Sequence, residues 1–441
     1  MADAEPSPLS PLAEVVIAPG SDPKRERRSS LRHHRDFRQL WTGDALGQVG
    51  FQLTGLALPV LAVNVLHATE WQMGVLSASR MLAFLLIGLP AGAWVDRMRK
   101  RRVLIAADLV RALVLAAVVV AALTGNATMP FLYVAALAIG GATVFFDVAH
   151  QSYVPSLVGM DHVVEGNSKL QATASVAQVA GPAIAGQLLR VVSAGALIGV
   201  NAVTYLVSAL FVSRIRATEE LPPVEDRRPL VEEIREGLAF VVGQPLLRRM
   251  VACTSIGNLA FGIMSAMEAL YILRELHLSA AAFGTIFSAA SVGGLAGALV
   301  GRRAAEWVGE ARLVPVTAIG MAVPIALVPL AATLPVPPMV TMIVGLGLSY
   351  FTIVVYNIAT VSFRQRLCPP RLLGRMNASV RFIIFGTAPI GGLLGGWLGT
   401  SLGVVPALWV AVVLTFAAAL PVVLSPLWTM TELPTVDSAG R

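Results

Sequence analysis

Long apolar runs, separated by short polar segments, fill the chain from about residue 39 to residue 427. Each run holds about twenty residues, the length an α-helix needs to cross the hydrocarbon core of a bilayer. Strands of a membrane β-barrel would instead alternate apolar and polar residues over about ten positions. The pattern therefore predicts twelve membrane helices, over residues 39–65, 73–95, 103–124, 129–152, 170–190, 194–214, 250–273, 280–300, 312–333, 338–361, 378–400 and 405–427.

Composition supports the same fold class. Hydrophobic residues make up 56% of the 441 residues and charged residues only 13%. Soluble domains carry roughly a quarter charged residues, because their surfaces are in contact with water. In lipid the backbone must satisfy its own hydrogen bonds, which helices do within one segment. We therefore predict an all-α integral membrane protein and exclude a soluble enzyme. The run around 166–190 is the least hydrophobic.

Lysine and arginine predict the orientation of the helices. The loops on one side of the predicted membrane are rich in these residues, whereas the opposite loops hold only Arg190 and Arg274. Short basic loops face the cytoplasm, so we expect both termini there, in a bacterial-type plasma membrane. The net charge of +7 fits this orientation better than a nucleic-acid partner. The basic segments are Lys24–Arg38, Arg97–Arg102, Lys169, Arg214–Arg249, Arg302–Arg312 and Arg364–Arg381.

A long polar loop divides the chain into two halves of six helices. Within it, the sequence PLVEEIREGLAFVVGQP at 229–245 has apolar residues at helical spacing, which predicts an amphipathic helix at the membrane surface. We expect five parts: a disordered cytoplasmic tail without a cleavable signal peptide, a first bundle, the linker, a second bundle and a short cytoplasmic tail. They cover residues 1–36, 37–214, 215–248, 249–428 and 429–441.

The two halves repeat each other in sequence. AGAWVDR at 91–97 corresponds to AGALVGR at 296–302, and GPAIAG at 181–186 corresponds to APIGG at 388–392. Two repeats in the same order at a similar offset predict two homologous six-helix units.

Six plus six helices, a long central loop and a basic loop after the second helix resemble the major facilitator superfamily, over about residues 37–428. The signature of that loop matches at Gly92, Asp96, Arg97, Lys100 and Arg101, with Arg99 in place of a glycine. The resemblance implies a conformational latch between the halves, in which Asp96 caps a helix of the other half. The alternative is that the basic residues only set topology.

Asp147 is assigned to the same latch, because relatives place an acid against the latch arginine at the end of the fourth helix. An ordinary interfacial carboxylate is the alternative. Gly181, Pro182 and Gly186 resemble the antiporter motif of the fifth helix, which is typical of exporters. Simple helix packing is the alternative there, since small residues let helices approach closely.

Three further segments resemble the drug and siderophore exporter branch, which includes enterobactin and macrolide exporters. They are FRQLWTGDALGQVG near the start, LVEEIREGLAFV in the linker and GRMNASVRF before the eleventh helix. Members often carry an acid after the glycine that corresponds to Gly50, where this chain has Phe51 and Gln52. Proton coupling through that position is therefore not expected.

Ionisable residues within the helices are candidates for function, because burying charge in a membrane is costly. Asp44 is near the cytoplasmic end of the first helix, and His150 is read as interfacial. Asp108 and Arg111 share a helix face and can neutralise each other. Helix three is peripheral in this superfamily, so we interpret that pair as structural.

Glu268 in the seventh helix is the main candidate for proton coupling, since a desolvated glutamate in the central cavity can exchange a proton. It can instead reach the outer interface, pair with Arg274, or pair with Arg80 at similar depth. Helices one, four, seven and ten line the cavity of this superfamily. Further cavity candidates are Gln52, Asn258, Tyr350, Tyr356 and Asn357.

We therefore predict a monomeric, proton-coupled exporter of a small amphipathic compound such as a drug, antibiotic or siderophore. Two six-helix bundles would rock about a central site. Its partners would be the substrate, protons and the lipid bilayer, and no cofactor, metal or ATP site is expected. An importer of the same fold and a non-transporting membrane receptor or scaffold remain as alternatives.

Overall fold

A computed structural model describes residues 31, 34–95, 97–159, 162–217, 219, 230–368 and 372–430. These residues form helices and short connections, without a strand among them. Within the same ranges, eleven helices are long and apolar enough to cross a membrane. The predicted all-helical membrane fold is confirmed.

Six long helices precede the linker. The first is followed directly by a π-helical turn, and the others are joined by short connections. They are α2 (Arg35–Val60) with η1 (Leu61–Val65), α3 (Glu70–Val95), α4 (Lys100–Leu123), α5 (Met129–Val158), α6 (Val163–Leu188) and α7 (Ala194–Ser213).

Helix α6 is the one predicted span that is not among these eleven helices, because the mean hydropathy of its sequence is too low. It has the length of a span, but it begins with polar residues such as Glu165 and Lys169. Because α6 contacts both α2 and α10, part of its surface faces protein rather than lipid. That environment tolerates the polar residues that lower its hydropathy.

A linker helix and a second set of helices follow. The helix predicted over 229–245 is present as α8 (Leu230–Gly243). The second set is α9 (Pro245–Leu270) with η3 (Tyr271–Glu275), α10 (Ala280–Val308), α11 (Glu310–Ile325), α12 (Leu327–Leu330), α13 (Pro338–Leu367), α14 (Leu373–Leu402), α15 (Val404–Val423) and the short η5 (Pro426–Trp428).

Several helices continue beyond the predicted apolar runs. Helix α13 extends six residues past the predicted end at 361, and α10 extends eight residues past 300. Backbone hydrogen bonding does not stop where the hydrocarbon stops, so charged residues such as Arg302 and Arg364 continue the helices into the polar region.

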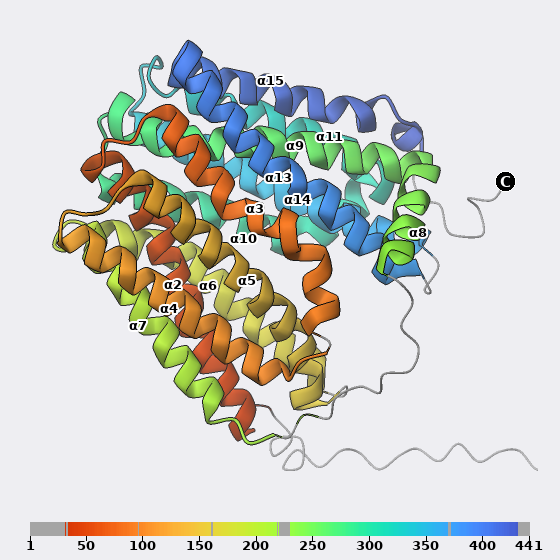
Figure 1. Ribbon diagram of the computed structural model, residues 1–441. Coiled ribbons are helices and arrows are strands. Elements are labelled where there is room, and N and C mark those ends of the chain that lie inside the picture. Colours follow the sequence, from red (N-terminus) through yellow and green to blue (C-terminus); the bar gives the residue numbers. More distant parts are fainter. Residues whose placement is uncertain are drawn as a thin grey trace, which may run out of the picture.

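The helices form two groups, α2–α7 and α9–α15, that diverge toward the side carrying α8 (Figure 1). We call this side the linker end, where α2 begins and α15 finishes. The opposite side is the far end, where α2 is connected to α3 and α9 to α10. Contacts between the groups are made by α3 with α14, α6 with α10 and α3 with α9.

Glycines allow the two groups to touch at the far end. A Cβ atom on Gly74 of α3 would lie only 2.6 Å from the Cα of Gly396 on α14. A Cβ atom on Gly186 of α6 would lie 3.0 Å from the Cα of Gly284 on α10. Arg274 adds a hydrogen bond across the groups, from its guanidinium to the carbonyl of Val63 at 3.3 Å. The far end is therefore closed by near backbone-to-backbone contact.

A matching turn follows the first helix of each group. The π-helical turns η1 and η3 are each followed by a Leu-His pair, whose histidine has a positive φ: 49° at His67 and 52° at His277. A hydroxyl side chain, Thr69 or Ser279, then accepts a hydrogen bond from the first turn of the next helix. The two groups thus share a local geometry at the far end.

Candidate functional site

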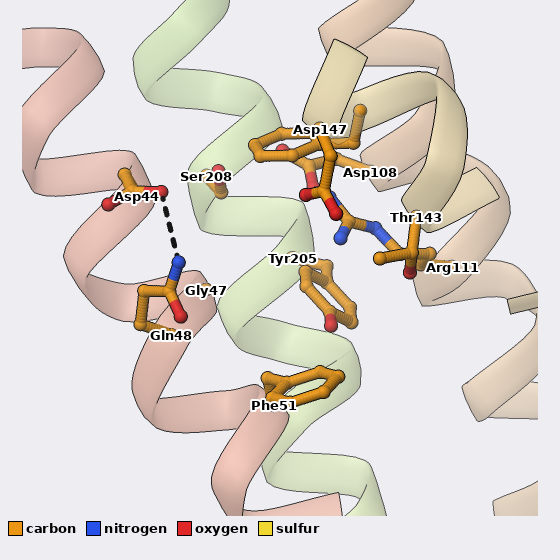
Figure 2. Close-up of a pocket in the computed structure, with 11 residues that line it drawn as sticks. Asp44, Gly47, Gln48, Phe51, Asp108, Arg111, Thr143, Asp147, Tyr205 and Ser208 are labelled. Atoms are coloured by element: carbon orange, nitrogen blue, oxygen red, sulfur yellow. Dashed lines mark hydrogen bonds and ion pairs between the residues drawn. The ribbon is translucent and has the colours of Figure 1, made fainter. Parts of the chain in front are cut away.

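A pocket of about 190 Å³ lies between α2, α4, α5 and α7, in the half of these helices nearer the linker end (Figure 2). Its lining includes three carboxylates, one guanidinium and three aromatic rings. Such a polar lining is costly inside an apolar helix bundle and marks a functional site. We call it the Arg111 pocket; its central residues are Asp44, Asp108, Arg111, Phe146, Asp147 and Tyr205.

Arg111 of α4 lies over two aromatic rings of this pocket. Its guanidinium carbon lies 4.2 Å from the ring centroid of Phe146 and 4.2 Å from that of Tyr205. Arg111 also forms an ion pair with Asp108, one turn earlier on the same helix, as the sequence predicted. Flat contact with two rings suits a guanidinium, which is planar and weakly hydrated.

Asp44 of α2 has a different set of neighbours. The Nε2 atom of His150 on α5 lies 3.8 Å from an oxygen of Asp44, and the side-chain amide of Gln48 donates to the same oxygen at 3.5 Å. The imidazole of His150 stacks on Phe146, with ring centroids 5.7 Å apart. Asp44 is buried away from water. These two long contacts replace only part of the hydrogen bonding that water would give its carboxylate.

Asp147 of α5 faces the same pocket. It lies within electrostatic range of Arg111, of Asp44 and of Arg381 on α14 in the second group. Helix α5 continues to Val158, well beyond Asp147. The structure therefore places Asp147 in the lining of the Arg111 pocket, eleven residues before the end of α5, and its assignment to the latch stays a prediction.

Two atoms of the central ion pair have no hydrogen-bond partner among the described residues. They are the second carboxylate oxygen of Asp108 and the Nε atom of Arg111. Both side chains are nine-tenths or more buried. A buried polar group without a partner loses its solvation energy with no compensation. The carboxylate oxygen can therefore accept a hydrogen bond, and the Nε–H group can donate one, if a polar group enters the pocket.

The sequence pattern did not identify this site. Asp108 with Arg111, and Asp147 with His150, are each three residues apart, so each pair lies on one face of its helix. That spacing was the available signal. It does not say that both faces turn inward toward Asp44.

Glu268 lies half-buried on α9. Tyr350 of α13 is within electrostatic range of it, which brings two predicted cavity residues together. Arg80 makes no ion pair with Glu268 in the described structure. Arg274 donates to Val63 across the groups rather than pairing with Glu268.

The other predicted cavity residues have varied surroundings. Gln52 packs on Gly181, where a Cβ atom would lie 2.5 Å from the Cβ of Gln52. Tyr356 is buried and shares a hydrogen bond with Thr254 at 3.0 Å. The side-chain amide of Asn258 donates to the carbonyl of Thr254 at 2.9 Å.

Asn357 is exposed on α13. Neighbouring helices therefore leave a substantial part of this residue uncovered.

The antiporter motif lies where the groups meet. The carbonyl of Pro182 and the backbone of Gly186 pack directly on Gly284 of α10. The motif thus forms the α6–α10 contact at the far end. This placement fits its predicted role and also fits simple close packing of helices.

The predicted latch is described in part. Gly92 has room for a side chain, because a Cβ atom there would meet no described atom within 4 Å. Asp96 lies outside the described residues. Arg97 is exposed. The latch stays a prediction.

The remaining latch residues hold the start of α4. The backbone N–H groups of Lys100 and Arg101 donate to the carboxylate of Glu219 at 2.5 and 2.7 Å. The side chain of Arg101 donates to the carbonyl of Val212 at 3.2 Å, at the end of α7. A carboxylate at a helix N-terminus satisfies free N–H groups and complements the helix dipole. These residues therefore fasten the linker to the first group.

Comparison with known proteins identifies similar transporters. Residues 40–366 match the model of the Major Facilitator Superfamily. The chain is 24% identical to the enterobactin exporter EntS of Citrobacter koseri, over 83% of this chain and 86% of that protein. It is 27% identical to the multidrug efflux pump Tap of Mycolicibacterium fortuitum, over 80% and 87%.

Solved structures share the fold. The nucleoside transporter NupG matches with a TM-score of 0.72 and 12% identity, over 88% of this chain and 98% of that one. A bacterial homologue of the iron transporter ferroportin, in an inward-facing state, matches with a TM-score of 0.69 and 16% identity, over 89% and 98%. These identities show a common fold only.

Proposed function

Because the chain belongs to the Major Facilitator Superfamily, we propose that it exports small amphipathic organic compounds by proton-coupled alternating access. The observation that carries the proposal is the asymmetry of the two helix groups. They touch through glycines at the far end and diverge toward the linker end, on the same side as the Arg111 pocket. A transporter that loads from one side needs this combination of a closed end and an open end.

The linker end is proposed to face the cytoplasm of a bacterial cell. Loops and helix ends there carry the positive charge that orients membrane proteins, including Arg99, Arg102, Arg302 and Arg303. With this orientation the pocket is loaded from inside the cell. Relatives named as an enterobactin exporter and a multidrug efflux pump support the outward direction.

Proton coupling is proposed to reside mainly in the Arg111 pocket. Asp44 and Asp147 are carboxylates on different helices, and the one buried guanidinium nearby is already paired with Asp108. A proton on either carboxylate removes a charge that the bundle solvates poorly. Glu268 remains a second candidate in the other group, where it lies within electrostatic range of Tyr350.

Everted membrane vesicles containing the full chain test the proposal. Respiration makes the vesicle interior acidic, and an exporter then accumulates its substrate inside. Ethidium and a panel of neutral, cationic and anionic organic compounds are the probes. We expect at least one compound to accumulate and nigericin, which collapses the pH gradient, to stop it. Accumulation that continues unchanged in the presence of nigericin would refute proton coupling.

Variants identify the coupling acid. Asp147→Asn should lose gradient-driven accumulation, and Glu268→Gln tests the second candidate in parallel. Glu306→Gln is the matched control, because Glu306 is an exposed acid on α10 whose one ion pair among the described residues is with Arg302, one turn away. If both Asp147→Asn and Glu268→Gln transport like the control, neither acid couples protons.

The same vesicles separate the two alternatives. An importer of this fold would deplete preloaded vesicles instead of filling them. A receptor or scaffold would move no compound in either direction. Either result would overturn the export proposal.

A further inference from the structure

The charges around the Arg111 pocket do not balance. Three carboxylates line it against one guanidinium, which leaves an excess of two negative charges when the carboxylates are ionised. Arg111 is committed to Asp108 and to its two aromatic neighbours. Asp44 and Asp147 therefore lack a cation of their own within the lining. Such an excess is costly away from water, so protons or another cation must offset it.

Among the described residues, the charged and titratable groups around these two carboxylates come from four helices. From α4 come Asp108 and Arg111, from α5 comes His150, from α7 comes Tyr205, and from α14 comes Arg381. His150 lies 3.8 Å from Asp44, beyond ordinary hydrogen-bond distance. Arg381 is exposed and belongs to the other helix group. No group in this set neutralises Asp44 and Asp147 fully.

A second observation points to a ligand. Asp108 is fully buried, yet one of its oxygens makes no hydrogen bond of ordinary geometry in the described structure, although the Ser208 hydroxyl lies near this carboxylate. Asp108 is itself a lining residue. A primary ammonium group carries three N–H donors and no acceptor. It could donate to carboxylates in the pocket and reduce their excess of negative charge. An anionic group would find donors such as Arg111 and Ser208, but it would add to that excess.

The volume decides which part of a substrate enters. About 190 Å³ is room for roughly six water molecules. Pockets that enclose a whole drug-sized ligand are larger, roughly 300–1,000 Å³. An ammonium group with a few carbons therefore fits, while the apolar remainder stays outside. Phe51, which is 42% exposed, lies in the lining and offers a ring to that remainder.

We propose that the Arg111 pocket binds the ammonium group of a cationic, amphipathic substrate, in exchange for a proton held by its carboxylates. The bound ammonium ion takes the place of the proton, and a carboxylic acid becomes a carboxylate as that proton leaves to solvent. Charge in the pocket is the same before and after the exchange. The inference rests on the proposed export function, and it selects organic cations over anionic siderophores.

Binding to the purified full chain in detergent tests the inference without requiring transport. The probe is dansylcadaverine, whose dansyl fluorescence reports binding and whose slender alkyl stem ends in an ammonium group. Its matched controls are the dansyl hexylamide, with a methyl group in place of the ammonium, and the dansyl aminohexanoate, with a carboxylate. We expect the cation to bind about tenfold or more tightly than either control.

Proton release gives a second readout. In a weakly buffered solution with a pH indicator, dansylcadaverine should release close to one proton for each molecule bound, and the hexylamide should release none. Asp44→Asn and Asp147→Asn should each lower the affinity for the cation by about tenfold or more and leave that for the hexylamide unchanged. Glu306→Gln should behave as the parent protein. Thermal unfolding of each variant confirms that it is folded.

Equal affinity for the three probes, or tighter binding of the anion, would overturn the inference. So would a loss of affinity for all three probes alike in folded Asp147→Asn. Failure of the export function is distinguishable. If dansylcadaverine binds as expected but does not accumulate in everted vesicles, the cation-binding site is supported and the export function is refuted. If an anionic compound accumulates in vesicles with Asp147→Asn and in vesicles with the parent protein, the export function is supported and the cation-binding site is refuted.

Discussion

The substitution Gly74→Ala tests whether closure of the far end depends on direct contact between the backbones of α3 and α14 at glycines. A Cβ atom at this position would lie 2.6 Å from the Cα of Gly396 and 2.7 Å from the carbonyl oxygen of Gly392. Both are backbone atoms and cannot rotate away. Ordinary van der Waals contact begins near 3.4 Å, so α3 and α14 must separate locally by up to 0.8 Å.

Overpacking of this size costs about 1–3 kcal/mol. The cost applies where α3 and α14 touch and disappears in a state whose far end is open. The equilibrium should therefore move toward the open state by about 5-fold to 150-fold. Alanine is also a better helix former than glycine by about 1 kcal/mol, but that gain is common to both states and does not affect the ratio.

Double electron–electron resonance between spin labels measures the population. Asn126 and Thr333 are exposed in far-end connections of the two groups and can be replaced by cysteine. The native thiols, Cys253 and Cys368, are buried, which favours selective labelling. Gly74→Ala should add a component at longer distance.

Gly88→Ala is the matched control, since it lies on the same helix and its Cβ atom would meet nothing within 4 Å in the described structure. It should give the distance distribution of the parent protein. If Gly74→Ala also gives the parental distribution, glycine contact does not hold the far end closed and the reasoning fails.

Tyr271→Phe should lower the free energy of unfolding by about 1–3 kcal/mol, because the buried hydroxyl donates to Pro329 at 3.1 Å and accepts from the N–H of Ala332 at 3.2 Å; an unchanged unfolding midpoint in mixed micelles would contradict this. Glu219→Gln should cost about 0.5–2 kcal/mol by weakening the cap on α4, and high salt should reduce the difference between variant and parent. Arg111→Lys should cost about 1–2 kcal/mol, since an ammonium cannot lie flat between two rings; equal stability would show that charge alone matters.

Hydropathy located the membrane helices well, because bilayer thickness limits the length of an apolar run. The run predicted over 103–124 is the helix Lys100–Leu123, and that over 194–214 is Ala194–Ser213. The weak run near 166–190 is a helix of full length that falls short of the hydropathy of a span. Its polar residues face protein in part, and an apolarity criterion cannot distinguish that environment from water.

The rotation of each helix about its own axis was not predictable. Asp108 and Arg111 form the expected ion pair. Their spacing shows that they share a helix face, but it does not show whether that face points to a neighbouring loop or to the centre of the bundle. Asp147 was expected near the end of the fourth helix, because relatives place an acid there against the latch arginine. The helix instead continues, and the residue meets Arg111. Long-range pairing of side chains depends on packing that no single segment contains.

The Leu-His turn at the far end has a consequence for the history of the chain. The same π-helical turn, the same histidine with positive φ and the same hydroxyl cap follow the first helix of each group, 210 residues apart at His67 and His277. A left-handed histidine is uncommon, so two at equivalent corners point to inheritance rather than coincidence. The gene would then descend from the fusion of two copies of a half-length ancestor, whose product worked as a pair of identical subunits with these corners facing each other.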